Sequence, residues 1–401
     1  MESIKFFDYY KTLNNEYIKD FKSNDGKIIG FYCSDIPEEL IHAAGFLPYR
    51  IRGSENFDFN KADALLSKFN CSFIRSTLNN ILNERYSFLD GFILANTCDH
   101  VRRIYDILKM KYEPIKKNEK HLFFISLPHT YSLEGLKWIY EEILQFKNSI
   151  EHNFKINIGI EEVKNALNIY EENKTLLSKI NEFRTSKDPK LTGTDFIKIT
   201  ISNNSVRKEF ANLQLKEILR YLEEEAVPIS QSKKIRARLM LVGSSVDNPS
   251  FIEILEHAGG IIVADNLCTG SRNFLNQNLF EFSNEANIDK IPTNYMNLQD
   301  LDSLIWYISY NTYNKILCPR MMNAHQYRLS LLKEFIKKYK IQGIILQRIE
   351  FCDLHGVENG LLAHEIQNEL GLPIINLDRE YFLGDTGRLK TRIEAFLEKI
   401  E

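Results

Sequence analysis

The sequence predicts an α/β fold with two doubly wound parallel-sheet lobes, a helical connector between them and an N-terminal helix. Short apolar runs alternate with segments of helical periodicity in the first part of the chain, which is the pattern of parallel strands joined by crossover helices. The same alternation returns near the C-terminus, after a stretch with helical periodicity alone. We therefore expect an N-terminal lobe over residues 1–150, a helical connector over 151–232 and a C-terminal lobe over 233–401.

The N-terminal lobe begins with charged and aromatic residues at helical spacing, which predict an amphipathic helix over residues 1–22. The stretch KIIGFYCSDIPEELIHAAGFLPYRIRG then predicts a strand, a turn, a helix and a second strand, with Pro37 at the first helical position. Residues 61–85 are predicted to be helical. Residues 92–95 are uniformly apolar and too few for an amphipathic helix, so they predict a buried strand that ends in the turn containing Cys98. A strand in HLFFISLPHT and a helix in LEGLKWIYEEILQF follow.

The connector carries apolar residues at helical spacing in EEVKNALNIYEENKTLLSKINEFR and VRKEFANLQLKEILRYLEEEAV, with the loop TSKDPKLTGTD between them. The stretch VPISQSKKIRA marks the expected boundary with the C-terminal lobe.

The C-terminal lobe repeats the order of elements found in the first. RLMLVGSSVDNPSFIEILEHAGGIIVAD matches the order of GFYCSDIPEELIHAAGFLPYRI, and QGIILQRIEFCDLHGVENGLLAHEI parallels DGFILANTCDHVRR. A last strand in GLPIINL and a helix in DTGRLKTRIEAFLEKI complete it. We therefore expect two copies of one unit, with Cys98 and Cys352 at equivalent strand ends.

The composition argues against several classes of protein. The formal net charge is -3 and the isoelectric point is near 6.4, so no basic face for a nucleic acid is expected. No apolar run is long enough to span a membrane, and the N-terminus lacks the apolar core of a signal peptide. Six cysteines without a secretory signal favour a reducing cytoplasm, where thiols are metal ligands or core residues.

The cysteines are Cys33, Cys71, Cys98, Cys268, Cys318 and Cys352. None lies two to four residues from another, which excludes zinc-knuckle and ferredoxin spacing, so any metal site must be assembled by folding. Cys98 and Cys352 would face one another across an interdomain cleft, and Cys71 could approach from the preceding helix. Three thiolates leave one iron of a 4Fe-4S cluster open for substrate chemistry. The alternative is that these are buried structural thiols.

Several passages resemble the family of 2-hydroxyacyl-CoA dehydratase and benzoyl-CoA reductase subunits. The most specific are NTCDHVRR, DNLCTGSR, FCD and TRIEAFLE. The resemblance implies two flavodoxin-like lobes around a 4Fe-4S cluster, held by three cysteines that match Cys71, Cys98 and Cys352 here. It also implies oxygen sensitivity and an anaerobic lifestyle, a paired homologous subunit in a homo- or heterodimer, and a separate activator that hydrolyses ATP to inject a low-potential electron. No phosphate-binding G-x-x-x-x-G-K-[ST] loop occurs in this chain, in agreement with a separate activator.

The activity that the resemblance implies is a radical-type dehydratase, a lyase. One electron turns the thioester carbonyl of a 2-hydroxyacyl-CoA into a ketyl radical anion, which expels the hydroxyl group. The alternatives are oxidoreductases, either a benzoyl-CoA reductase-type subunit or a homodimeric double-cubane reductase, and a cluster-free scaffold that pairs with a catalytic subunit. Three cysteines at the expected places count against the scaffold.

Other polar residues are candidates for the site. Ser34 follows the first strand, where this family places a serine close to the substrate in one subunit type; the alternative is a helix N-cap. Glu38 and Glu39 are acid/base candidates or first-turn charges, and we predict Ser34 and Glu39 as catalytic residues. The remaining thiols are expected to pack or to support the site, and capping or packing is expected of the histidines that follow Cys98 and Cys352: these are Cys33, Cys268, Cys318, His100 and His355. Arg102, Arg103 and Arg272 could hold the CoA phosphates or pair with acids.

Overall fold

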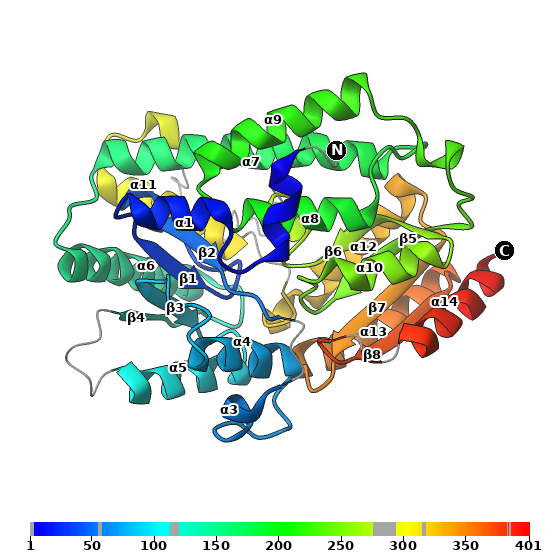
Figure 1. Ribbon diagram of the computed structural model, residues 1–401, viewed down its shortest axis with the longest axis horizontal. Coiled ribbons are helices and arrows are strands. Elements are labelled where there is room, and N and C mark those ends of the chain that lie inside the picture. The colour runs from blue at the N-terminus through cyan, green and yellow to red at the C-terminus, as the bar shows by residue number, and fades with distance from the viewer. Residues whose placement is uncertain are drawn as a thin grey trace.

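The computed structural model describes residues 4–54, 58–112, 120–275, 294–314, 318–382, 384 and 386–401. Two four-stranded sheets lie side by side with helices packed on both (Figure 1). The first contains β1 (Ile28–Phe31), β2 (Leu47–Arg50), β3 (Gly91–Ala95) and β4 (His121–Ile125) in the order β2-β1-β3-β4. The second contains β5 (Ala237–Gly243), β6 (Gly260–Asn266), β7 (Gly343–Ile349) and β8 (Ile374–Arg379) in the order β6-β5-β7-β8. We call the parts of the molecule around these sheets the N-terminal and C-terminal halves.

All neighbouring strands in both sheets are parallel, so the predicted α/β class with parallel sheets is confirmed. Numbered within each half, the two strand orders are identical, and they are consistent with flavodoxin-like lobes. The strand register is also equivalent in the two sheets. Phe31 pairs with Ile93 in the first sheet, and Gly243 pairs with Gln347 in the second. Cys98 follows Ile93 by five residues and Cys352 follows Gln347 by five, so the two thiols occupy equivalent places.

The α-helices cover the sheets and join the halves. Those in the N-terminal half are α1 (Glu16–Ser23), α2 (Glu38–Ala43), α3 (Asn60–Asp63), α4 (Ser72–Leu82), α5 (Asp99–Tyr112) and α6 (Leu133–Phe154). Those that follow are α7 (Ile160–Thr185), α8 (Gly193–Asn203), α9 (Lys208–Glu224), α10 (Pro249–His257), α11 (Leu301–Asn314), α12 (His325–Tyr339), α13 (Asp353–Leu370) and α14 (Thr386–Ile400).

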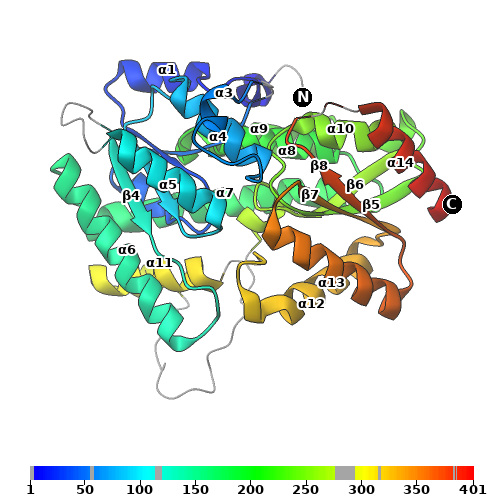
Figure 2. The same cartoon turned by 90° about the horizontal axis from the view of Figure 1, so that it is seen from below.

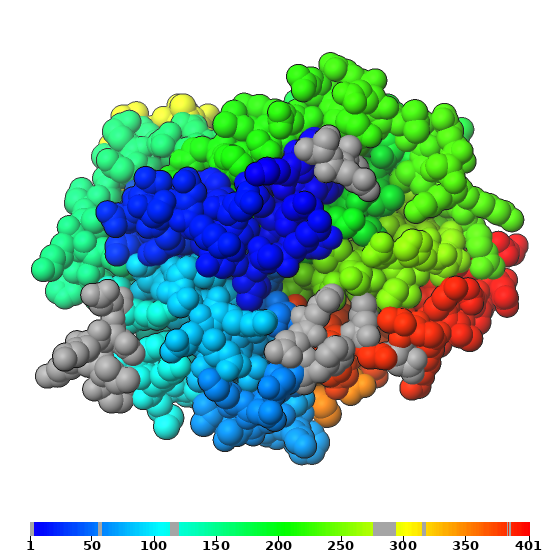
Figure 3. Space-filling model, in the orientation of Figure 1, coloured from blue at the N-terminus to red at the C-terminus, as the bar shows by residue number. Residues whose placement is uncertain are grey.

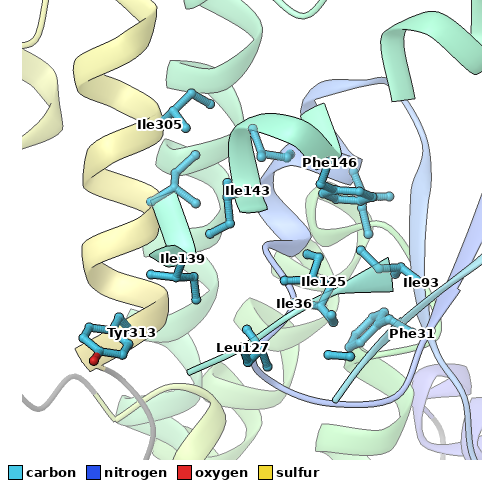
Figure 4. Close-up of a cluster of buried hydrophobic side chains, with 14 of the residues drawn as sticks. Phe31, Ile36, Ile93, Ile125, Leu127, Ile139, Ile143, Phe146, Ile305 and Tyr313 are labelled. Atoms are coloured by element: carbon cyan, nitrogen blue, oxygen red, sulfur yellow. The ribbon is translucent and has the colours of Figure 1, made fainter. Parts of the chain in front are cut away.

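Each sheet is buried on both faces, which explains why its strands are almost continuously apolar. In the first sheet Ile29 and Phe31 point into one hydrophobic cluster, while Ile28 points into another on the opposite face. Figure 4 shows the first cluster, where Phe31, Ile93 and Ile125 of neighbouring strands meet the side chains of α6. Full burial of one such large apolar side chain contributes about 1.5–3 kcal/mol.

The N-terminal segment differs from the single helix that we expected over residues 1–22. A 3-10 helix, Lys5–Lys11, is followed by α1, and Asn15 separates them. The Asn15 side chain accepts a hydrogen bond from the backbone N–H of Ile18 at 3.0 Å, so it caps α1 and stops one helix from running through. In Figure 3 this segment lies against the connector helices.

The connector contains the two expected helices, α7 and α9, and one that we did not predict, α8. Thr192, at the end of the predicted loop, caps α8 by accepting from the backbone N–H of Asp195. The lobe boundaries at residues 150 and 232 stay predictions.

Helix α11 follows β6 along the chain but packs on the N-terminal half, against α6 (Figure 2). Its Ile305 belongs to the same cluster as Ile139 and Ile143 of α6. The chain therefore crosses between the halves more than once. None of the described helices is both long and apolar enough to cross a lipid bilayer.

Candidate functional site

A cavity of about 140 Å³ lies between the two halves, and every cysteine of the sequence lines it. The thiols alternate with apolar side chains, among them Ile74, Val101 and Ile349. Residues that are far apart along the chain thus form a single concentration of thiols in a mainly apolar enclosure.

Each half supplies three of the six thiols. From the N-terminal half, Cys33 follows β1, Cys71 precedes α4 and Cys98 precedes α5; from the C-terminal half, Cys268 follows β6, Cys318 lies in the segment before α12, and Cys352 precedes α13. Ligands in open parallel sheets bind beyond the carboxyl ends of the strands, and here those ends supply thiols from both sheets.

The three predicted ligands share a place at the start of a helix. Cys71 and Cys352 are the N-cap residues of α4 and α13, and Cys98 directly precedes α5. Nearby backbone N–H groups of the first helical turn act to lower the pKa of each thiol: those of Phe73 and Ile74 at Cys71, those of His100 and Val101 at Cys98, and that of His355 at Cys352. These N–H groups and the helix dipole both favour a thiolate.

Burial works against the charged form while no cation is present. It raises the pKa of the Cys71 thiol to about 12 and that of Cys352 to about 11, and it raises the pKa of Cys98 well above its usual value. The neighbouring thiols add to these shifts, since Cys71 interacts with Cys352 and Cys98 interacts with both. Binding of a metal cation would therefore displace protons from the sulfurs.

The cavity also has a cationic side. Arg50 and Arg272 line it, and Arg320 lies close enough to Cys33 and Cys318 for each thiol to raise the pKa of the guanidinium. Arg320 is almost fully buried and pairs with Asp35 at 3.1 Å. These cations suit a site that holds a group of negative charge.

Ser34 lines the cavity, as the sequence predicted for a site residue. Its hydroxyl donates to the carbonyl oxygen of Cys268 at 3.0 Å and accepts from Nη1 of Arg50 at 3.0 Å. Arg50 also donates to the Cys268 carbonyl at 2.8 Å. Ser34 and Arg50 of one half thus fix the Cys268 turn of the other.

Glu38 and Glu39 lie outside the residues that line this cavity. Glu38 accepts from the Tyr170 hydroxyl at 3.4 Å and lies 3.8 Å from Lys208, while Glu39 lies 4.0 Å from Lys174. Both carboxylates thus face the connector helices. The catalytic role of Glu39 stays a prediction.

Of the candidate histidines and arginines, some lie near the thiols and others lie on the surface. The backbone N–H of Cys71 donates to Nδ1 of His100 at 3.3 Å, and burial lowers the His100 pKa, which keeps that nitrogen an acceptor. His355 lines the cavity, and its buried Nδ1 has no hydrogen-bond partner among the described residues. Arg102 and Arg103 pair with nearby acids of α5 on the surface.

Sequence reasoning placed Cys33, Cys268 and Cys318 outside the ligand set, yet they line the same cavity as the predicted ligands. The only signal that could have grouped them is their distribution, three in each half of a duplicated chain. The described residues contain no group of His, Cys, Asp and Glu arranged to hold a single metal ion. A cluster makes a different demand, because each thiolate binds a different iron, and the set of buried thiols with N–H donors fits it.

The protein has two parallel sheets of flavodoxin-like strand order, and a thiol-lined cavity lies between the two halves. These features define a two-lobed α/β protein with a candidate cluster site. Residues 33–400 match the family model described as 2-hydroxyglutaryl-CoA dehydratase, D-component. The chain therefore belongs to this family, and the resemblance inferred from the motifs is confirmed.

The relatives are similar over their whole length. The chain is 25% identical to the (R)-phenyllactyl-CoA dehydratase beta subunit of Clostridium sporogenes, with 99% of each chain covered. It is 23% identical to one of the benzoyl-CoA reductase subunits of Thauera aromatica, covering 98% of this chain and 96% of the relative. It is 20% identical to the beta subunit of (R)-2-hydroxyglutaryl-CoA dehydratase from Acidaminococcus fermentans, covering 95% of this chain and 94% of the relative. Dehydratase and reductase subunits are thus both among its relatives.

Proposed function

We propose that this chain is the 4Fe-4S cluster-bearing subunit of a 2-hydroxyacyl-CoA dehydratase-like enzyme, with Cys71, Cys98 and Cys352 as the cluster ligands. The observation that carries the proposal is the common geometry of these three thiols. They come from both halves, line one cavity and lie at helix N-termini, where nearby backbone N–H groups act to lower the pKa of each thiol. Family membership supports the same reading.

When bound, the cluster would supply a low-potential electron and an iron without a protein ligand, which suits removal of the hydroxyl group of a 2-hydroxyacyl-CoA by way of a ketyl radical. The chain itself would provide the enclosure. Ile74, Val101 and Ile349 exclude water, and the backbone N–H groups at the helix starts stabilise the thiolates. Ser34 would present its hydroxyl to the substrate from its place on the cavity wall.

The size of the cavity bears on how substrate would bind. At about 140 Å³ it is smaller than the roughly 300–1,000 Å³ of most small-molecule pockets. A CoA thioester would therefore bring only its acyl end to the thiols, with the rest of CoA held outside. The relatives are named as subunits, which supports a paired homologous subunit, and we propose that a separate ATP-hydrolysing activator supplies the electron in an anaerobic cytoplasm.

A second candidate is a reductase that carries a double-cubane cluster. The observation that favours it is the convergence of all six thiols on one cavity, where three would suffice for a 4Fe-4S cluster. In this case Cys33, Cys268 and Cys318 would be ligands as well. A benzoyl-CoA reductase-type activity is the third reading, since one relative is named as such a subunit.

Iron and sulfide quantification with EPR spectroscopy, after anaerobic purification and reconstitution, tests the cluster. About four irons per chain are expected for one 4Fe-4S cluster and about eight for a double cubane; fewer than about three would refute the proposal. Serine substitutions separate the two clusters. Cys71→Ser should remove iron in either case, whereas Cys268→Ser should leave about four irons in the first case and reduce the content in the second.

Turnover decides the substrate. With the activator, ATP and reductant present, a panel of 2-hydroxyacyl-CoAs and benzoyl-CoA should be tested. Formation of an enoyl-CoA supports the dehydratase. Reduction of benzoyl-CoA alone would assign the reductase.

A further inference from the structure

A second and larger cavity lies between the halves, apart from the thiols. Its volume is about 610 Å³, and none of its lining residues lines the cysteine cavity. Its walls come from residues 10–14 of the N-terminal segment, the turn after β2 at residues 52–54, and the start of α10 at residues 247–250, together with Arg85 and Tyr381. The lining is rich in hydroxyl, amide and guanidinium groups, so water can fill it.

A small third cavity shares wall residues with each of the other two. It shares Arg52 and Asp247 with the larger cavity and Arg50 with the cysteine cavity. Its volume of about 10 Å³ is at the lower limit for holding one water molecule. Its polar lining side chains are Asn204, Ser205 and Thr269, together with the shared residues. The three cavities thus lie in a row, from the large polar cavity to the thiols, with shared residues in their walls.

Asp247 lines both the large cavity and the small one. It is 6% exposed, and its Oδ1 has no hydrogen-bond partner among the described residues. Its Oδ2 accepts from the backbone N–H of Gly53 at 3.3 Å, and Tyr381 lies near the carboxyl and acts to lower its pKa. A buried acceptor without a partner is costly unless a water or a proton satisfies it.

The charges around Asp247 leave this carboxyl able to hold a proton. Burial raises its pKa above the usual value, while Arg52 from the turn after β2 and Arg379 from β8 oppose that shift. Tyr381 is the third ionisable group that faces it. Burial dominates, so the carboxyl takes up a proton more readily than an exposed aspartate does.

We propose that these cavities are a path for water and protons between solvent and the cysteine cavity, with Asp247 relaying the proton between the large cavity and the small one and Ser34 at the inner end. The inference rests on the proposed function. An expelled hydroxide must gain a proton and leave as water, and a reduction must take up a proton for each electron.

Each transfer along the path is balanced. A solvent proton adds to the Asp247 carboxylate, and the Asp247 O–H then passes its proton to the water in the small cavity as that water gives one onward. One O–H bond breaks and one forms at each step, and no oxidant or reductant is needed. Arg50, which touches both the small cavity and the Ser34 hydroxyl, orients the inner end of the path.

The variant Asp247→Asn tests the relay, since it keeps the shape of the side chain and cannot carry the proton in the same way. We expect turnover to fall by about tenfold or more, with a larger solvent isotope effect and a changed pH profile, while iron content and the EPR signal stay at the wild-type level. Glu256→Gln is the matched control. Glu256 is also a buried carboxyl, held by the backbone N–H groups of Gly193 and Ile262, and it lines none of the three cavities. This variant should keep the wild-type isotope effect.

A second readout does not require the cluster. Infrared spectra of the metal-free chain should contain a protonated-carboxyl band that titrates with pH, is lost in Asp247→Asn and remains in Glu256→Gln. Wild-type turnover and isotope effect in Asp247→Asn, or the absence of this band at every pH at which the chain is folded, would overturn the relay. If the wild-type chain turns over no acyl-CoA, the proposed function fails, and the infrared band alone decides whether Asp247 exchanges a proton with water.

Discussion

The turn after β1, with the sequence CSDIP at residues 33–37, and the turn after β5, with the sequence SVDNP at residues 245–249, follow the first strand of their respective halves. Asp35 and Asp247 hold the same place in these turns, before the equivalent prolines. Arg320, from the segment before α12, pairs with Asp35, and the first turn lines the cysteine cavity. The Asp247 carboxyl of the second turn accepts from the Gly53 N–H, lies near Tyr381, Arg52 and Arg379, and lines the large cavity.

Both turns therefore border a cavity, but they differ in how the aspartate is held. Asp35 forms a buried ion pair with Arg320, whereas Asp247 has a backbone N–H on one oxygen and Arg52 and Arg379 nearby. The positions of the thiols also differ between the two halves. Cys33 of the first turn corresponds to Ser245 of the second, and the C-terminal half places its thiol after β6 instead, at Cys268. Equivalence thus holds strictly only for Cys98 and Cys352.

The largest expected effect tests that equivalence. Cys98→Ser and Cys352→Ser should each reduce the iron content after anaerobic reconstitution to below about one per chain, because each removes one of three ligands from a shared cluster. Iron analysis and EPR spectroscopy check this. Full retention of iron in both variants would refute the ligand assignment, and loss in only one would break the equivalence of the two positions.

The next largest expected effect concerns the first turn, which contains Asp35. Arg320→Met should lower the free energy of unfolding by about 3–5 kcal/mol, because it leaves the buried Asp35 carboxylate without its partner. Urea denaturation of the metal-free chain measures this. In the second turn, Asp247→Asn should change the free energy of unfolding by less, since no buried ion pair is lost. Equal losses in the two variants would show that the two turns do not differ in this way.

The pH dependence separates the turns further. The raised pKa of Asp247 means that its contribution to stability is fully present below its ordinary pKa of 3.8 and is lost as the pH rises through the folded value. The stability of Asp247→Asn relative to the wild type should therefore increase from about pH 4 to about pH 8. Urea denaturation across that range checks the sign. A difference that is constant with pH would contradict the shift.

The smallest effect compares the residues that precede the equivalent thiols. Phe351 has a φ of 64°, in the left-handed region, whereas Thr97 before Cys98 is not among the described residues with positive φ. Phe351→Gly should be more stable than Phe351→Ala by about 1 kcal/mol, since glycine adopts this conformation without strain. Both variants lose the ring contact with Phe69, so their difference in thermal unfolding isolates the backbone term. An alanine variant as stable as the glycine variant would contradict the strain.

The strands and the equivalence of Cys98 and Cys352 could be predicted because both depend on short sequence patterns. An apolar run that stops at a polar turn marks the end of a buried strand wherever the strand lies in the sheet. Cys71 could be proposed from its place on the preceding helix, and the family resemblance implied the same residue as a ligand. The arrangement of strands in two sheets then followed from the alternation with helices, as the observed order and register bear out.

The rest depended on contacts between distant parts of the chain. Cys268 and Cys318 meet the other thiols only because the two sheets face each other, and no local pattern records that. Ser34 and Glu39 are close in sequence, yet the first turn directs the serine to the cavity and the helix directs the glutamate to Lys174. The packing of α11 on α6 is likewise set by complementary apolar faces rather than by sequence position.

The division of the thiols, three from each half, gives whatever they bind a mechanical role. A group held by Cys98 and Cys352 ties together two points separated by more than half of the chain, and thus acts as a cross-link that restricts the unfolded state. Such a cross-link would add to the contacts that already join the halves, among them the packing of Ile349 and Tyr381 in a hydrophobic cluster of the N-terminal half.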